Sequence, residues 1–233
     1  MKKTSKKNLR PGECAQCQAH FSKSKILTHL KTCLANDPPP SKKPIRWLHI
    51  EIEGRYLKDY WLHVAIPALW ELADLDQFLR DIWLECCGHL SGFMIDDDCY
   101  SCAPDDEAMG LGALFETGED SMNVKLEEVL SVGTQFSYEY DYGSTTDLVL
   151  RVVDSFEAAR TRGGVRILAR NLPPEFRCAG CEQPATQLAN GGNGLDPEDC
   201  YCDDCAKELD AEEQEMLMPI VNSPRVGVCG YCG

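Results

Sequence analysis

Two pairs of residues that commonly bind metal lie close together near the amino terminus. Cys14 and Cys17 form a Cys-x2-Cys knuckle, and His29 and Cys33 follow with a His-x3-Cys spacing after eleven intervening residues. On a short helix His29 and Cys33 share one face, so all four side chains can point at one ion. Four thiolate and imidazole ligands suit tetrahedral zinc. His20 is a weaker alternative ligand, and a disordered basic tail is the alternative structure.

A second set of knuckles lies in the carboxyl-terminal tail. Cys178 and Cys181 are followed, after twenty residues, by Cys202 and Cys205, which is the spacing of a zinc ribbon or a treble clef. All-cysteine sites are usually structural, which argues against zinc-dependent hydrolysis. The remaining cysteines of the tail are either spare or part of a second centre: Cys200, Cys229 and Cys232. Alternatively, the final Cys-x2-Cys pairs with the first knuckle, and iron–sulfur ligation stays open.

Four cysteines of the central region form a third candidate group. Cys86 and Cys87 end an expected helix, and Cys99 and Cys102 lie in the loop beyond the next strand. If that loop folds back, the two pairs can meet at a metal ion, and His89 can replace one of the first two ligands. The alternative is that Cys86 or Cys87 is buried as a small apolar residue and that the other pair lies in an ordinary loop.

Charge divides the chain into two unlike parts. Residues 1–46 hold eleven Lys or Arg against two acidic side chains, whereas the remainder holds 12 basic and 36 acidic ones, and the whole chain carries −15. Basic residues 1–46 can bind nucleic acid through its phosphates, and a protein partner or the acidic remainder of the chain are the alternative contacts. No apolar run approaches the roughly 20 residues of a membrane span, and the amino terminus lacks a secretory signal. We therefore expect a cytoplasmic, bacterial protein, in which cysteines bind metal more often than they form disulfides.

The central region predicts an α+β domain. Apolar residues spaced three and four apart from Leu72 to Cys86 predict a helix with one apolar face. Asp74 and Gln77 can cap it, with a start one turn earlier as the alternative, and Gly88 is expected to end it. Strands are predicted at 46–53, 60–67, 90–95, 135–142, 148–153 and 165–169, a short helix at 124–130 and an acidic loop at 96–107. A turn at 163–164 is expected to join the last two strands. The expected fold is α+β, with a mainly antiparallel sheet packed on one principal helix and flanked by small zinc-binding modules.

These features predict four segments. They are a basic zinc-finger-like module at 1–36, a Pro-rich linker at 37–45, the α+β domain at 46–171 and a Cys-rich module of the zinc-ribbon or treble-clef kind at 172–233. Within the last segment, residues 206–219 read as one helix.

The central segment resembles the plasmid pRiA4b open-reading-frame-three-like family. Three stretches carry the resemblance, at 60–67, 72–93 and 132–148, and the motif residues are Gly88, His89, Leu90, Tyr138, Tyr140, Asp141 and Gly143. The resemblance implies an α+β domain in which a strand pair, a helix and another strand precede the tyrosine-rich segment. Many relatives have an Asp, a Trp and a His after the glycine, where this chain has Ser144, Thr145 and Thr146, so roles of those residues do not carry over. The family has no settled biochemical activity.

Catalytic patterns are scarce in this sequence. His63 and His89 read as structural, because no nucleophile and partner are spaced as in a known motif. The leading hypothesis is therefore a non-enzymatic binding or adaptor protein with structural zinc. The second hypothesis is a nucleic-acid-associated factor that uses residues 1–46. The third is an enzyme with a site near Tyr140 and Asp141.

Overall fold

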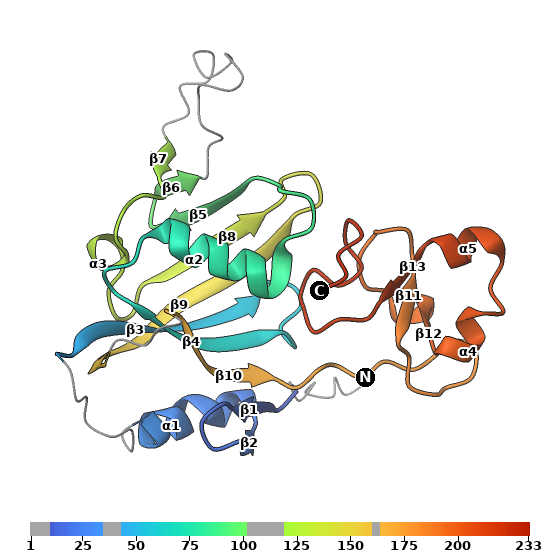
Figure 1. The fold of residues 1–233 in the computed structure, drawn as a ribbon, viewed down its shortest axis with the longest axis horizontal. Coiled ribbons are helices and arrows are strands. Elements are labelled where there is room, and N and C mark those ends of the chain that lie inside the picture. The colour runs from blue at the N-terminus through green and yellow to red at the C-terminus, as the bar shows by residue number, and fades with distance from the viewer. Residues whose placement is uncertain (1–9, 35–42, 102–118, 160–163) are drawn as a thin grey trace, which may run out of the picture.

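The fold is mixed α/β, with few helices and one large, mostly antiparallel sheet. The computed structural model describes residues 10–34, 43–101, 119–159 and 164–233 (Figure 1). Ten strands form the main sheet in the order β2-β1-β10-β4-β3-β9-β8-β5-β6-β7, and every neighbouring pair is antiparallel except β6–β7. The strands are β1 Gly12–Cys14, β2 His20–Phe21, β3 Ile45–Gly54, β4 Trp61–Pro67, β5 Ser91–Ile95, β6 Asp98–Ser101, β7 Glu119–Ser121, β8 Gln135–Tyr140, β9 Thr146–Ala158 and β10 Arg166–Asn171.

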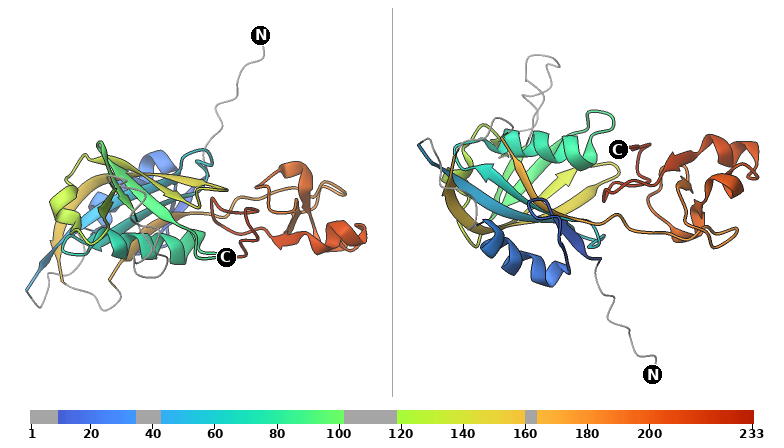
Figure 2. Two further views of the ribbon diagram at one scale, coloured as in Figure 1. Left: turned by 90° about the horizontal axis from the view of Figure 1, so that it is seen from above. Right: turned by 60° about the horizontal axis from the view of Figure 1, so that its bottom comes forward.

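Side chains of the central strands alternate between two hydrophobic clusters, one on each face of the sheet. Leu48, Ile50 and Ile52 of β3 belong to the main core under helix α2 (Leu72–Leu79). Trp47 and the β4 residue Trp61 belong to a second cluster, under helix α1 (Lys23–Leu34). Figure 2 shows the two helices on opposite sides of the sheet. Because both faces are covered, β4 is buried along its whole length, and β3 is more buried than the expected half-buried strand.

The amino-terminal segment is part of this sheet. Strand β1 pairs with β10, and β2 pairs with β1. The buried face of α1, formed by Ile26, Leu30 and Cys33, packs in the cluster that also holds the two tryptophans. Helix α1 has 12 residues and α2 has 8, so the longest α-helix among the described residues belongs to the amino-terminal segment. Residues 35–42, which hold most of the expected linker, lie outside the described residues.

Helix α2 begins one turn before the predicted cap and ends before the predicted glycine. Glu71 and Asp74 form the capping box. After Leu79 the chain continues as a π-helical turn, η1 (Arg80–Leu84), and leaves the helix at Glu85. Gly88 has a φ of +70° but lies three residues beyond that end, so it does not terminate the helix as expected. Its left-handed backbone instead bends the loop that carries the neighbouring cysteines and histidine.

Three other expectations about the domain need correction. Residues 98–101 of the expected acidic loop form β6, which pairs with β5. Strands β9 and β10 are not hairpin neighbours, because β3 and β4 lie between them in the sheet. The tyrosine alternation stops at Asp141, whose φ of +64° turns the chain, and Tyr142 is 51% exposed. The other predicted strands and the short helix, α3 (Leu126–Val129), are confirmed within a few residues.

The tail forms a small three-stranded sheet and then returns to the main domain (Figure 1). Its strands are β11 Gln187–Ala189, β12 Cys200–Tyr201 and β13 Leu217–Pro219, with a 3-10 turn, η3 (Pro197–Asp199), before β12. The expected helix at 206–219 is wrong for most of its length: α4 (Asp203–Ala206) ends where it should begin, α5 (Ala211–Glu215), capped by Asp210, covers only its middle, and its last residues form β13. Beyond β13, Val226 is fully buried in the main core. Among the described residues, no helix is long and apolar enough to cross a membrane.

Candidate metal centres

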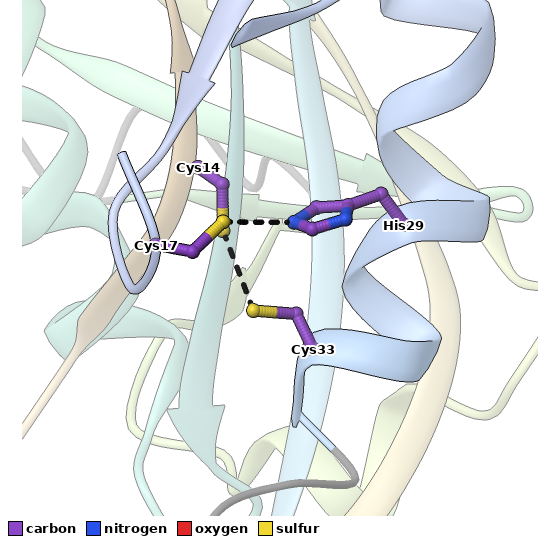
Figure 3. Close-up of side chains that lie close together, drawn as sticks. All are labelled: Cys14, Cys17, His29 and Cys33. Carbon is purple, nitrogen blue, oxygen red and sulfur yellow. Dashed lines mark hydrogen bonds between the residues drawn. The ribbon is translucent and has the colours of Figure 1, made fainter. Parts of the chain in front are cut away.

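The first group of ligands, here called the N-terminal site, unites the turn after β1 with helix α1. The ligand atoms of Cys14, Cys17, His29 and Cys33 all lie within 4.8 Å of one another, and Figure 3 shows the four side chains converging. His29 and Cys33 lie four residues apart on α1, one helical turn, as their spacing predicts. The ring of Phe21 stacks on that of His29 at 3.9 Å between centroids, which fixes the orientation of the imidazole.

The second group, the C-terminal site, has the same knuckle backbone. Its ligand atoms, from Cys178, Cys181, Cys202 and Cys205, also lie within 4.8 Å of one another. In both sites the first cysteine donates its N–H to the carbonyl five residues on, at 3.0 Å from Cys14 and 2.8 Å from Cys178. In both, the residue four positions after the first cysteine has a positive φ and donates back to that cysteine's carbonyl, at Gln18 and Glu182. Cys202 caps α4, and Cys205 lies one turn inside it.

The distances between ligand atoms fit a tetrahedral ion. With metal–sulfur bonds of about 2.3 Å and metal–nitrogen bonds of about 2.1 Å, tetrahedral geometry separates two sulfurs by about 3.8 Å and a sulfur from a nitrogen by about 3.6 Å. The Sγ atoms of Cys14 and Cys33 are 3.9 Å apart, and those of Cys181 and Cys202 are 3.6 Å apart. Cys17 Sγ lies 3.3 Å from His29 Nε2. Each group can therefore close around one ion without rearrangement of the backbone.

A third group, here called the mixed site, joins residues that are far apart in the sequence. The ligand atoms of Cys86, Cys87, His89 and Cys229 lie within 4.8 Å of one another. This corrects the expected composition of the central group, because Cys99 lies in β6 and is not a member. Cys102 lies outside the described residues. His89, interpreted from the sequence as structural, is a potential ligand, as the alternative ligand set allowed.

The remaining candidate ligands lie elsewhere. Cys200 is fully buried and its thiol donates to the Asp196 carbonyl at 3.3 Å. Cys232 is exposed, with its thiol 3.2 Å from the Gly230 carbonyl. His20 contacts Glu13 at 3.2 Å. Among the described residues these three are outside all three groups. The suggestion that the final Cys-x2-Cys pairs with the first knuckle of the tail is wrong, because Cys229 joins the mixed site.

Backbone N–H groups and neighbouring sulfurs shift the pKa values of the clustered thiols, in opposite directions. Burial raises the pKa of the Cys178 thiol, but backbone N–H groups, including those of Cys202 and Gly180, outweigh it and lower the pKa to about 6. Burial and the neighbouring Cys14 raise the pKa of Cys33 to about 11. Contact with Cys86 raises the pKa of Cys87 to about 11. Adjacent thiols cannot all ionise at neutral pH unless a metal ion offsets their charge.

Tyr140 and Asp141, the expected centre of an enzyme site, have structural partners. The Tyr140 side chain is fully buried and its hydroxyl donates to Glu85 Oε1 at 3.0 Å. Asp141 pairs with the fully buried Arg225, with 2.7 Å between Oδ2 and the guanidinium. His63 is fully buried and lies 3.0 Å from His49, in keeping with a structural role.

Comparisons with known proteins give no function. No family model matches the chain, and no curated protein sequence is similar to it. A crystal structure described as a protein of unknown function, MM3350 from Methanosarcina mazei Go1, has a TM-score of 0.43 and 15% sequence identity, covering 55% of this chain and 68% of that one. That similarity is too low to support an argument, so the function has to be inferred from the sites themselves.

Sequence reasoning correctly placed neither of the two residues that bring the tail to the main domain, Cys229 and Arg225. Cys229 was expected in a second centre with Cys200 and Cys232 or beside the first knuckle of the tail, and Arg225 was not singled out. The signal for both was a set of apolar residues between the tail module and the last cysteines, Ile220, Val221, Val226 and Val228, because apolar side chains in a polar tail need a core to cover them.

Proposed function

We propose that this protein is a non-enzymatic adaptor whose N-terminal and C-terminal sites each hold a structural zinc ion. The observation that supports the proposal is the closed set of four Cys or His ligands at each site. Catalytic zinc keeps one position for water or substrate, whereas a structural site is filled by four protein ligands. Zinc rather than iron–sulfur is proposed because the first site includes an imidazole and both sites have zinc-knuckle backbones.

Zinc at the C-terminal site would supply most of the stability of a segment with little core of its own. Around the C-terminal site, the short strands and helices bury few large side chains, mainly Leu188, Met218 and the ligand Cys178. The free energy of binding structural zinc is folding free energy for such a segment. The outer surfaces of the modules would then be rigid enough to bind a partner, and we propose a protein partner.

The proposed family, domain division and location of the protein rest on sequence motifs. We propose that residues 46–171 belong to the pRiA4b-like family, that residues 1–36 and 172–233 are its added zinc modules, and that the protein works in the bacterial cytoplasm. The motifs at Gly88–Leu90 and Tyr138–Gly143 and the paired cysteines support this assignment.

Native mass spectrometry with elemental analysis of chelator-free protein tests the zinc proposal. Replacing Cys17 or Cys181 with serine should each remove one zinc ion, because both side chains are exposed ligands. Cys200→Ser is the matched control, since that thiol lies outside the three groups, and it should keep the wild-type metal content. Folded wild-type protein without zinc would refute the proposal. Stoichiometric iron together with sulfide would show an iron–sulfur cluster in place of zinc.

Nucleic-acid binding is the second candidate, and one observation favours it. Lys25 and Lys31 of α1 are exposed, whereas Lys23 forms an ion pair with Glu53 of β3 and is only 10% exposed. The charge-reversing variant Lys25→Glu/Lys31→Glu of the full chain should lose any salt-sensitive binding to a DNA or RNA duplex. No binding by the wild type at low salt would remove this candidate and leave the protein partner.

A further inference from the structure

The mixed site lies where the end of the tail meets the loop after η1. We propose that Cys86, Cys87, His89 and Cys229 bind a third zinc ion, which fastens the last residues of the chain to the main domain. This inference rests on the proposed zinc function and extends it from two modules to their attachment. Three ligands come from one loop and the fourth from 140 residues further along the chain, so this ion would be a cross-link rather than the core of a small module.

The histidine is oriented as a metal ligand. Its Nε2 lies 3.4 Å from Cys229 Sγ, near the sulfur–nitrogen separation of about 3.6 Å that a tetrahedral zinc requires. Its other nitrogen, Nδ1, lies 3.6 Å from Asp141 Oδ1. Metal-binding histidines commonly direct their second nitrogen at a carboxylate, which fixes the tautomer and the ring orientation. Asp141 is therefore a positioning residue for His89.

A buried arginine supplies positive charge beside the sulfurs. Zinc bound to three thiolates carries a net charge of −1, and at this partly buried site a nearby positive charge compensates it. Arg225 is fully buried, and its Nη2 lies 3.4 Å from Cys86 Sγ and 2.7 Å from Asp141 Oδ2. One guanidinium thus contacts both a ligand and the carboxylate that faces His89. Arg225 and Cys229 both belong to the end of the tail, so docking of that segment brings the fourth ligand and the compensating charge together.

The backbone around the ligands is bent to bring them together. Gly88 has a φ of +70° between Cys87 and His89, and its N–H donates to Glu85 Oε1 at 2.6 Å. The Tyr140 hydroxyl accepts N–H groups from Cys86 and His89, both at 3.4 Å. Cys229 itself has a φ of +50°, a backbone conformation that is strained for a residue other than glycine. Coordination of its sulfur would offset that strain.

The site also explains how the small sheet of the tail is held. The Cys229 N–H donates to the Gly192 carbonyl at 3.3 Å, and Gly194 donates to the Gly227 carbonyl at 2.7 Å. The loop after β11 therefore hydrogen-bonds to the same segment that enters the mixed site. Losing the third ion would loosen the tail module from the main domain while leaving the C-terminal site intact.

Metal content of the full-length protein under mild chelator competition tests this proposal. Wild type should retain three zinc ions, and Cys229→Ser should retain two, because three ligands bind the third ion much more weakly. Cys232→Ser is the matched control, since Cys232 lies three residues away in the same motif and outside the site, and it should retain three. If wild type holds only two zinc ions, and Cys17→Ser and Cys181→Ser each lose one of them, the third site is refuted and the proposed function stands. If wild type holds no zinc, both proposals are refuted.

Alkylation of the wild-type thiols provides a readout that does not depend on whether a variant folds. With zinc bound, Cys86, Cys87 and Cys229 should be protected from N-ethylmaleimide and become reactive together when the metal is removed, although Cys87 is exposed. Cys232, also exposed, should react throughout. Reaction of Cys87 in zinc-loaded protein as fast as that of Cys232 would overturn the proposal. A wild-type mass 2 Da below that of the reduced chain, with a disulfide that includes Cys229, would also overturn it. So would a Cys229→Ser variant that still holds three zinc ions.

Discussion

Replacing Arg225 with methionine tests how strongly the tail is bound to the main domain. The guanidinium donates to the Ser144 carbonyl at 3.2 Å and to Thr146 Oγ1 at 3.0 Å, besides its ion pair with Asp141. It also lies 4.8 Å above the centre of the Tyr140 ring. Methionine keeps the apolar stem but removes every one of these donors, so the Asp141 carboxylate stays buried without its counter-charge.

The expected loss follows from the burial of the pair. Removing one partner of a buried ion pair costs about 3–5 kcal/mol of unfolding free energy. Asp141 Oδ1 still accepts N–H groups from Gly143 at 3.1 Å and Ser144 at 3.2 Å, which places the expected loss at the lower end, about 3 kcal/mol. Adding Asp141→Asn should recover part of it, because a neutral amide costs less to bury than an unpaired carboxylate.

Urea unfolding of zinc-loaded protein, followed by tryptophan fluorescence, measures this loss. All four tryptophans lie between residues 47 and 83, so the signal reports the main domain. Lys207→Met is the control, since its ion pair with Asp204 joins side chains that are 73% and 93% exposed, and it should leave the midpoint unchanged. A loss below about 1 kcal/mol for Arg225→Met, or a double variant less stable than the single one, would refute the reasoning.

Two further predictions use the sheet. Burial lowers the pKa of both His49 and His63 to about 3, below the unfolded value of about 6.5; the unfolded chain therefore binds more protons below pH 6.5. The two neutral histidines contribute their full stabilisation above pH 6.5. Between pH 6.5 and pH 3 the free energy of unfolding should fall by up to about 1.4 kcal/mol per pH unit for each histidine. Urea midpoints of His63→Gln should show a shallower pH dependence than wild type, and an unchanged slope would contradict this. Leu30→Ala, at a position 1% exposed in the cluster with Trp47 and Trp61, should destabilise the tryptophan-monitored transition by about 2–5 kcal/mol, whereas an independent finger would leave that transition unchanged.

The local metal-binding patterns could be predicted from the sequence because their geometry is set by neighbouring residues. A Cys-x2-Cys knuckle places both sulfurs through one tight turn, and His29 and Cys33 share a helix face at four residues' spacing. The apolar stripe of α2 was predictable for the same reason. The structure brought together each of the two predicted sets of four ligands.

The tertiary structure decided what joins distant parts of the chain. Pairing of β1 with β10 brings the finger onto the sheet, and Cys229 reaches His89 across 140 residues. No local spacing encodes such contacts, since they depend on where long segments pack and on the entropy of closing the intervening chain. The sequence alone thus determined which residues could bind metal within each terminal module. Only the packing of residues 220–228 against the main core decided that Cys229 belongs with Cys86, Cys87 and His89, because burial of Val226 and Arg225 places that cysteine beside them.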